Sequence, residues 1–108
     1  MIKKKNLYLE ELLNSGLKNH KENNLEGAEN YYTKILKKDK KNFNALYLLG
    51  TIFFQKKKFD KAIKSFESAI LINPNHAELC NNYGATLIQT GEYKKSINYF
   101  QKAIKIKP

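Results

Sequence analysis

The chain has few or none of several residue types, and each absence excludes a kind of structure or a location. Its 108 residues include no arginine, no tryptophan, two prolines and one cysteine. The lone Cys80 excludes a disulfide within the chain and fits a reducing compartment. No apolar run approaches the roughly 18 to 20 residues that a membrane-spanning helix requires, and Glu10 and Glu11 precede any apolar run typical of a secretion signal. We therefore expect a soluble, cytoplasmic protein.

Residue groups that carry catalysis are also missing. The two histidines, His20 and His76, are far apart in the sequence, and no helical pair of histidines with a glutamate suggests a metal site. There is no glycine-rich phosphate loop, and the adjacent Glu10 and Glu11 fall on different sides of a helix. We predict no catalytic residue, no metal ligand and no cofactor in this chain, and leave open a catalytic domain elsewhere in a longer parent protein.

Lysine dominates the charge of the chain. All 20 basic residues are lysines and, against 10 acidic residues, they give a net charge of +10. Asparagine and isoleucine are abundant too, and all three residues have codons rich in adenine and thymine, so genome composition explains the excess better than a partner does. The lack of arginine removes the bidentate contacts that recognise bases and phosphates. We expect neither nucleic acid nor a membrane as partner, with lysine-mediated binding of an anionic partner as an alternative.

The sequence repeats itself with a period of 34 residues. Gly16, Gly50 and Gly84 lie at this spacing, and each is followed at fixed offsets by a similar set of residues. These sets are Ala28, Tyr32, Ile35 and Lys40 in the first copy, Ala62, Phe66, Ala69 and Pro74 in the second, and Ser96, Phe100, Ala103 and Pro108 in the third. A fixed period of this length indicates a stacked array of structural repeats.

Within each period the apolar residues have helical spacing, which predicts two helices per repeat. The expected helices span 7–21, 25–38, 43–56, 59–72, 76–90 and 93–106. Asn42 and Asn75 are placed to cap the helices that follow them. We expect Gly50 to let its helix approach Ala62 closely, with Phe66 filling the space toward the neighbouring pair of helices.

These residues resemble the signature of the tetratricopeptide repeat family. The second copy matches it best, through Leu46, Leu49, Gly50, Phe53, Ala62, Phe66, Ala69 and Pro74. The resemblance covers residues 9–108 as three repeats, at about 9–42, 43–76 and 77–108, after a basic segment at 1–8. It implies an all-α fold, a right-handed superhelical solenoid of about six helices, whose first helices line a concave surface.

The resemblance also implies where such a protein binds a peptide or a partner helix. Carried over by distance from each glycine, the candidate binding residues of the concave face are Asn14, Leu17, Tyr47, Leu48, Thr51, Phe54, Asn81, Asn82, Ile88 and Gln89. Asn14 and Asn82 occupy matching sites, in an arrangement similar to the asparagine ladder of O-linked N-acetylglucosamine transferases. Tyr47 and Phe54 are the candidates for affinity, with ordinary packing between repeats as their alternative role.

Family members that clamp the acidic carboxyl terminus of chaperones need lysine or arginine and asparagine at five sites of this face. The five residues found there are Leu13, Leu17, Leu48, Glu78 and Asn82. None of them is basic, and Glu78 repels an acidic peptide. We therefore do not expect an acidic chaperone terminus as the partner.

The last repeat ends without a further helix to cover its apolar side chains. Ile97, Phe100, Ile104 and Ile106 are the residues left without this cover. We favour a fragment of a longer protein, with self-association of two copies through this end as the alternative. The preferred function is a non-catalytic scaffold for protein–protein interaction, with self-association as one alternative.

Overall fold

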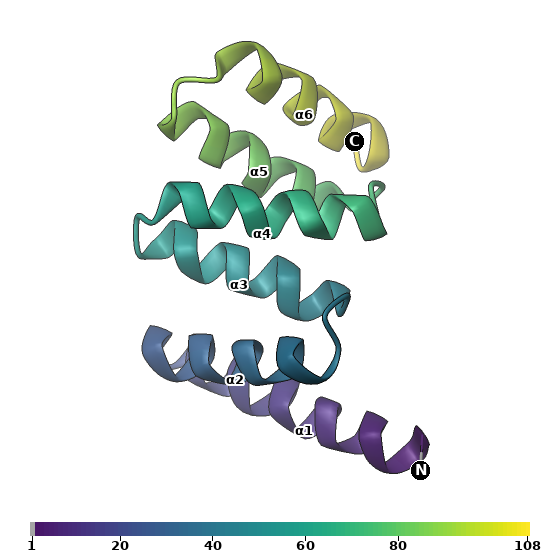
Figure 1. The fold of residues 1–108 in the computed structure, drawn as a ribbon. Coiled ribbons are helices and arrows are strands. Elements are labelled where there is room, and N and C mark those ends of the chain that lie inside the picture. The colour runs from purple at the N-terminus through teal and green to yellow at the C-terminus, as the bar shows by residue number, and fades with distance from the viewer. Residues whose placement is uncertain (1) are drawn as a thin grey trace.

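The computed structural model describes residues 2–108, with side chains from Lys4 onward, and these residues form six helices and no strand. Each helix packs against its neighbours in the chain, so that the helices stack in chain order with the two termini at opposite ends (Figure 1). The stack measures 44 × 26 × 22 Å and is a right-handed superhelical solenoid of three helical pairs. The helices are α1 (Ile2–Lys21), α2 (Leu25–Lys38), α3 (Phe43–Gln55), α4 (Phe59–Ile72), α5 (Ala77–Gln89) and α6 (Tyr93–Ile106).

The expected helix bounds are confirmed for α2, α4 and α6, and hold within one residue for α3 and α5. The expected start of α1 at residue 7 is wrong, because this helix already begins at Ile2. Residues 2–6 contain neither glycine nor proline, and lysine is a good helix former, so nothing there stops the helix. Met1, the first residue of the expected basic segment at 1–8, lies outside the described residues.

The turn inside each pair of helices recurs with the same period as the sequence. Asn23, Lys57 and Gly91 each adopt a positive φ, of 62°, 62° and 82°. The next residue in each turn donates its backbone N–H to a carbonyl five residues earlier, at 2.8 to 2.9 Å, which satisfies one of the free carbonyls at the end of the first helix. The 34-residue period is therefore a period of backbone conformation as well as of side chains.

One of the two expected helix caps is wrong. Asn42 caps α3 as expected, since its Oδ1 accepts a hydrogen bond from the backbone N–H of Ala45 at 3.0 Å. The cap of α5 is His76, whose Nδ1 accepts from the N–H of Leu79 at 3.1 Å, rather than Asn75. The N–H of Asn75 donates instead to Oδ1 of Asn73 at 3.1 Å. This turn moves the start of α5 one residue along the chain.

The core consists of two clusters of buried side chains that share helix α3. The first joins α1, α2 and α3 through Leu12, Ala28, Tyr32, Ile35, Ala45, Leu49 and Ile52. The second joins α3, α4 and α5 through Leu46, Ala62, Phe66, Ala69, Leu79, Tyr83 and Leu87. Each cluster unites one pair of helices with the first helix of the next pair. Isolated helices of 13 or 14 residues are marginal, so these contacts between repeats hold the fold together.

The close approach of two helices at Gly50 involves the ring of Phe66. A Cβ atom added at Gly50 would lie 2.5 Å from Cε1 of Phe66, so the phenyl ring packs directly on the glycine. Gly16 faces Tyr32 and Gly84 faces Phe100 in the same way. The spacing in the sequence correctly marks a close approach of two helices, but it is the aromatic ring of the second helix that requires the glycine.

Candidate functional site

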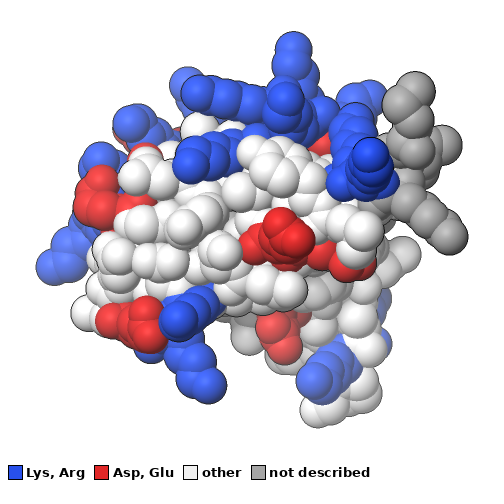
Figure 2. Space-filling view, turned by 90° about the horizontal axis from the view of Figure 1, so that it is seen from below, with Lys and Arg blue, Asp and Glu red and all other residues white. Residues whose placement is uncertain are grey.

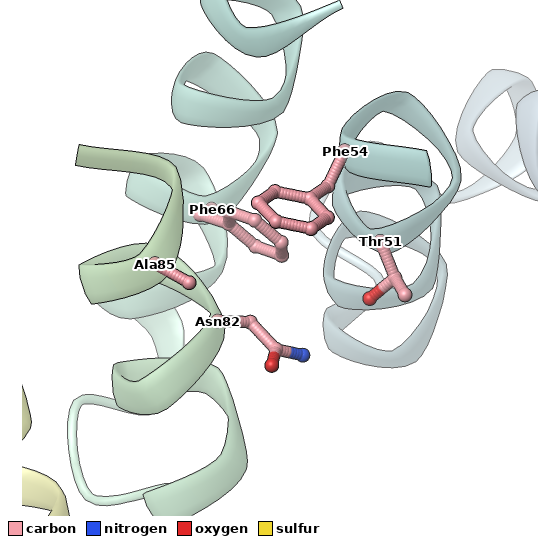
Figure 3. A pocket seen from close by; sticks show the side chains of 5 residues that line it. All are labelled: Thr51, Phe54, Phe66, Asn82 and Ala85. Carbon is pink, nitrogen blue, oxygen red and sulfur yellow. The ribbon is translucent and has the colours of Figure 1, made fainter. Parts of the chain in front are cut away.

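The first helices of the three pairs, α1, α3 and α5, form one face of the stack, which we call the inner face. A small cavity of about 60 Å³ lies on it between α3 and α5 (Figure 3). Thr51 and Phe54 from α3 line one side, Asn82 and Ala85 from α5 line the other, and Phe66 reaches it from α4. The packing of Phe66 on Gly50 thus also builds a wall of this cavity.

Two polar side chains border the cavity. The Thr51 hydroxyl donates to the backbone carbonyl of Tyr47 at 3.1 Å, and Nδ2 of Asn82 donates to the Tyr47 hydroxyl at 3.5 Å. Among residues 4–108, whose side chains the structure describes, no group donates a hydrogen bond to Oδ1 of Asn82. The cavity is therefore apolar inside, with the amide of Asn82 available to accept and donate hydrogen bonds at its edge.

Tyr47 connects α3 to α5 beside this cavity. Its ring stacks on Phe43 at 6.1 Å and meets the ring of His76 at 5.0 Å, and its hydroxyl donates to Oε2 of Glu78 at 3.3 Å. Burial, with a smaller contribution from the charge of Glu78, raises the pKa of Tyr47 to about 12. Tyr47 is therefore neutral and packs between two repeats. Packing of this kind is the alternative to a binding role that the sequence leaves open for this residue.

The structure brings together only part of the set of candidate residues. Thr51, Phe54 and Asn82 surround one cavity. Leu48 is half-buried against the first core cluster. The exposed candidates outside the cavity lining are Asn14, Leu17, Asn81, Ile88 and Gln89. The candidate set lacks Phe66, because an aromatic residue of a second helix does not stand out as a binding residue.

The residues proposed for self-association are not equally accessible. Ile97 and Ile104 on α6 are 54% and 64% exposed. Phe100 is half-buried, and its ring packs on Gly84 inside its own pair of helices. Ile106 is half-buried as well.

One lysine is a structural residue. Nζ of Lys56, at the end of α3, lies 2.7 Å from Oε1 of Glu29 and also forms an ion pair with Glu26, both on α2. The hydrogen bonds to Glu26 and Glu29 raise the pKa of Lys56, and the hydrogen bond to Lys56 lowers the pKa of Glu26. This side chain is only 15% exposed and ties the first repeat to the second.

Other lysines are gathered at the edges of the molecule. Figure 2, seen from the α1 end, shows lysines most densely along the upper edge, with others at the left and lower rim, around a largely uncharged middle that carries some acidic side chains. In the part of the chain that the structure describes, no group of three histidine, cysteine or acidic side chains is placed to hold a metal ion. None of the helices described there has the length and apolar character to cross a membrane.

Comparison with known proteins identifies the family. The family model described as anaphase-promoting complex, cyclosome, subunit 3 matches residues 21–103. The 34-residue period and the stacked pairs of helices agree with this family match. The chain belongs to this family of tetratricopeptide repeat proteins.

Curated relatives of this tetratricopeptide array are much longer than the chain. It is 38% identical over 60 residues to the peroxisomal targeting signal receptor of Saccharomyces cerevisiae, which is 56% of the chain and 10% of the relative. It is 27% identical over 81 residues to the anaphase-promoting complex subunit 3 of Schizosaccharomyces pombe, which is 75% of the chain and 12% of the relative. The array thus spans about a tenth of the length of these relatives.

A solved structure confirms the fold. A mutant O-GlcNAc transferase of Thermobaculum terrenum superposes with a TM-score of 0.93 at 20% identity, over 96% of this chain and 20% of the enzyme. At this identity the likeness concerns the tetratricopeptide fold alone.

Proposed function

We propose that this tetratricopeptide array is a non-catalytic protein-interaction scaffold, which holds an extended segment of a partner protein on its inner face. The observation that carries the proposal is the cavity between α3 and α5, where residues from three helices meet around a small apolar space. Such a concave, mostly apolar site with a few polar groups at its edge is the usual form of a binding site.

The size of the cavity points to a small aliphatic side chain of the partner. Its volume of about 60 Å³ is well below the roughly 150 Å³ that admits a benzene ring. A valine or leucine side chain would bury its methyl groups against Phe54, Phe66 and Ala85. We expect a tryptophan or tyrosine at the same position of the partner to be rejected.

The polar groups at the edge fit the backbone of an extended partner. The Asn82 amide can accept from a peptide N–H and donate to a peptide carbonyl, which orients a chain without reading its side chains. The carboxylate of Glu78 is exposed nearby, on the Tyr47 hydroxyl. An acidic residue next to the aliphatic anchor is therefore disfavoured.

The names of the relatives support an interaction role. One is named a peroxisomal targeting signal receptor and another a subunit of the anaphase-promoting complex. The enzyme among the solved structures matches the array over only 20% of its length. A scaffold is therefore the function that the family and the cavity favour together.

A selection experiment tests the proposal. A phage-displayed library of random peptides is selected on the full chain, and the affinity of the winning peptides is measured by fluorescence anisotropy. Ala85→Leu fills the cavity, and we expect it to weaken binding at least tenfold, because the aliphatic anchor has no space. Asn82→Ala removes the amide and is expected to weaken binding by a smaller factor.

The matched control is Ser68→Leu, which adds the same side chain at an exposed position of α4. It should bind the peptides as the unchanged protein does, and circular dichroism should show the same helicity for all variants. Peptides whose affinity is the same for Ala85→Leu and the unchanged protein would overturn the proposal.

A further inference from the structure

A second depression lies where the first repeat meets the second, between α1, the end of α2 and the start of α3. Its volume is about 270 Å³, above the roughly 150 Å³ that admits a benzene ring, so it is large enough for a whole side chain. The residues that line it are Asn6, Leu9, Glu10, Leu13, Ile35, Asp39, Asn42 and Asn44. Two carboxylates thus stand beside amides and aliphatic side chains, and none of the lysines that the structure describes lines the depression.

The equivalent place in the next repeat is filled by the protein's own aromatic side chains. The residues that stand 34 positions after Leu9, Leu13 and Asn42 are Phe43, Tyr47 and His76. Their three rings pack together with centroid distances between 5.0 and 6.1 Å, and the Tyr47 hydroxyl donates to the carboxylate of Glu78 at 3.3 Å. An apolar side chain with a hydrogen-bond donor at its tip therefore occupies the second site, whereas smaller side chains leave the first site open.

The open depression is suited to a side chain with an apolar stem and a positive charge at its tip. Glu10 on α1 is exposed, and Asp39 in the loop after α2 is half-buried. Oδ2 of Asp39 accepts a hydrogen bond from Nδ2 of Asn42 at 3.3 Å, and a carboxylate has room for further donors. Among residues 4–108, neither carboxylate forms an ion pair. A lysine side chain can bury its stem on the aliphatic residues while its ammonium donates to acceptors from two elements.

Nearby lysines limit the affinity of this site but do not change the sign of charge that it selects. Lys40 and Lys41 stand in the same loop as Asp39 and are both exposed. Their charges oppose the approach of a cation and are screened by solvent and salt. An anionic group would have to lie against the two carboxylates, so the depression rejects it.

Helix α3 connects the depression with the cavity of the inner face. Asn44 and Thr51 are seven residues apart and so lie on the same side of this helix, about 10 Å apart along its axis. Asn44 lines the depression toward α1, and Thr51 lines the cavity toward α5. Because an extended chain advances about 3.3 Å per residue, a segment anchored in the cavity reaches the depression no fewer than three residues away.

We propose that this depression binds a lysine side chain of the extended segment that the inner face holds. The stem of the lysine packs on Leu9, Leu13 and Ile35, and its ammonium group donates to Glu10 and Asp39. This assignment rests on the proposed function, because it specifies one more residue of the same segment. A chain with a net charge of +10 favours acidic partners by its overall charge, whereas this depression selects a basic residue at one position.

A scan of a peptide selected from the library tests the proposal on the full chain. Each residue from three to about six positions on either side of the aliphatic anchor is replaced in turn by lysine or by norleucine, which has an aliphatic stem and no charge. We expect lysine to bind roughly fivefold more tightly than norleucine at one of these positions, the upper end of the effect of an exposed ion pair.

Two variants of α1 provide the matched comparison. Glu10→Gln should remove the preference for lysine, whereas Glu11→Gln should keep it, because Glu11 is exposed and does not line the depression. Both substitutions change the net charge equally. Equal binding of the lysine and norleucine peptides at every position would overturn the proposal, as would equal effects of the two variants.

A small probe separates this proposal from the peptide site in the cavity. The ¹⁵N-labelled full chain is titrated with Nα-acetyl-lysine methylamide and, as control, with the norleucine derivative. We expect only the lysine derivative to shift the backbone amide signals of Glu10, Asp39 and Asn44, and we expect Ala85→Leu to show the same shifts. These shifts without any peptide binding would overturn the proposed function and support the lysine site, whereas their absence would overturn the lysine site.

Discussion

Replacing Gly50 by alanine tests the packing that shapes both the core and the cavity. The added Cβ would lie 2.5 Å from Cε1 and 2.6 Å from Cδ1 of Phe66, a fully buried ring that must shift toward the cavity beside it or strain its neighbours. Overpacking costs about 1–3 kcal/mol, and a contact this short on a buried ring belongs in the upper part of that range, about 2–3 kcal/mol, whereas the better helix propensity of alanine returns about 1 kcal/mol. We expect Gly50→Ala to lower the free energy of unfolding by about 1–2 kcal/mol.

Gly84→Ala is the matched control. Its added Cβ would lie 2.9 Å from Cε1 of Phe100, which is only half-buried and can shift outward. Here the gain in helix propensity offsets the cost of the close contact, and we expect the free energy of unfolding to change by close to zero. For a domain of this size, the Gly50 variant should melt roughly 4–16 °C below the unchanged protein, as measured by circular dichroism with urea titration as a second method.

A second substitution tests whether the clash with the Phe66 ring causes the loss of stability. In the Gly50→Ala background, Phe66→Leu should recover part of the lost stability, because the smaller side chain removes the clash, so the double variant should be more stable than the sum of the single effects. Equal stability of Gly50→Ala and the unchanged protein would refute the reasoning, as would equal losses for Gly50→Ala and Gly84→Ala.

The remaining predictions concern turns, caps and ionisation. Lys57→Gly should stabilise the array by about 1 kcal/mol in urea titrations, because Lys57 holds a φ of 62° that favours glycine; no gain would contradict this. His76→Ala should cost about 1 kcal/mol through loss of the α5 cap, whereas Asn75→Ala should cost less, and the reverse order would contradict the assignment of the cap. Burial raises the pKa values of Tyr32, Tyr47 and Tyr83 to about 12 from the ordinary 10.0. Their contribution to stability is therefore present below pH 10 and lost as the pH rises toward about 12, and completion of all tyrosine ionisation by pH 11 in ultraviolet absorbance would contradict it.

Most of the fold could be predicted because several features of the sequence and of the backbone share one period. The glycine interval, the apolar spacing and the turns at Asn23, Lys57 and Gly91 all carry the same 34-residue period. The N-terminal end of α1 escaped prediction because residues 2–6 have no counterpart in the pattern. The cap of α5 did so because the side chain of Asn73 engages the N–H of Asn75 and leaves the cap to His76, a competition that spacing alone does not show.

The candidate site could be predicted only as a face. Distance from the glycines predicts that Thr51, Phe54 and Asn82 share one face, but the cavity that they line depends on how the Phe66 ring turns toward Gly50. Likewise, Lys56 is one of 20 lysines in the sequence, and only the juxtaposition of α2 and α3 singles it out as a partner of Glu26 and Glu29.

Nuclear magnetic resonance of the full chain with a selected peptide tests the binding site on the inner face most directly. The chain is labelled with ¹⁵N and titrated with a peptide obtained from the library. We predict that the largest shifts of backbone amide signals belong to Thr51, Phe54, Asn82 and Ala85 and that they vanish for Ala85→Leu. Shifts confined to the second helices α2, α4 and α6, with these four residues unaffected, would contradict the account.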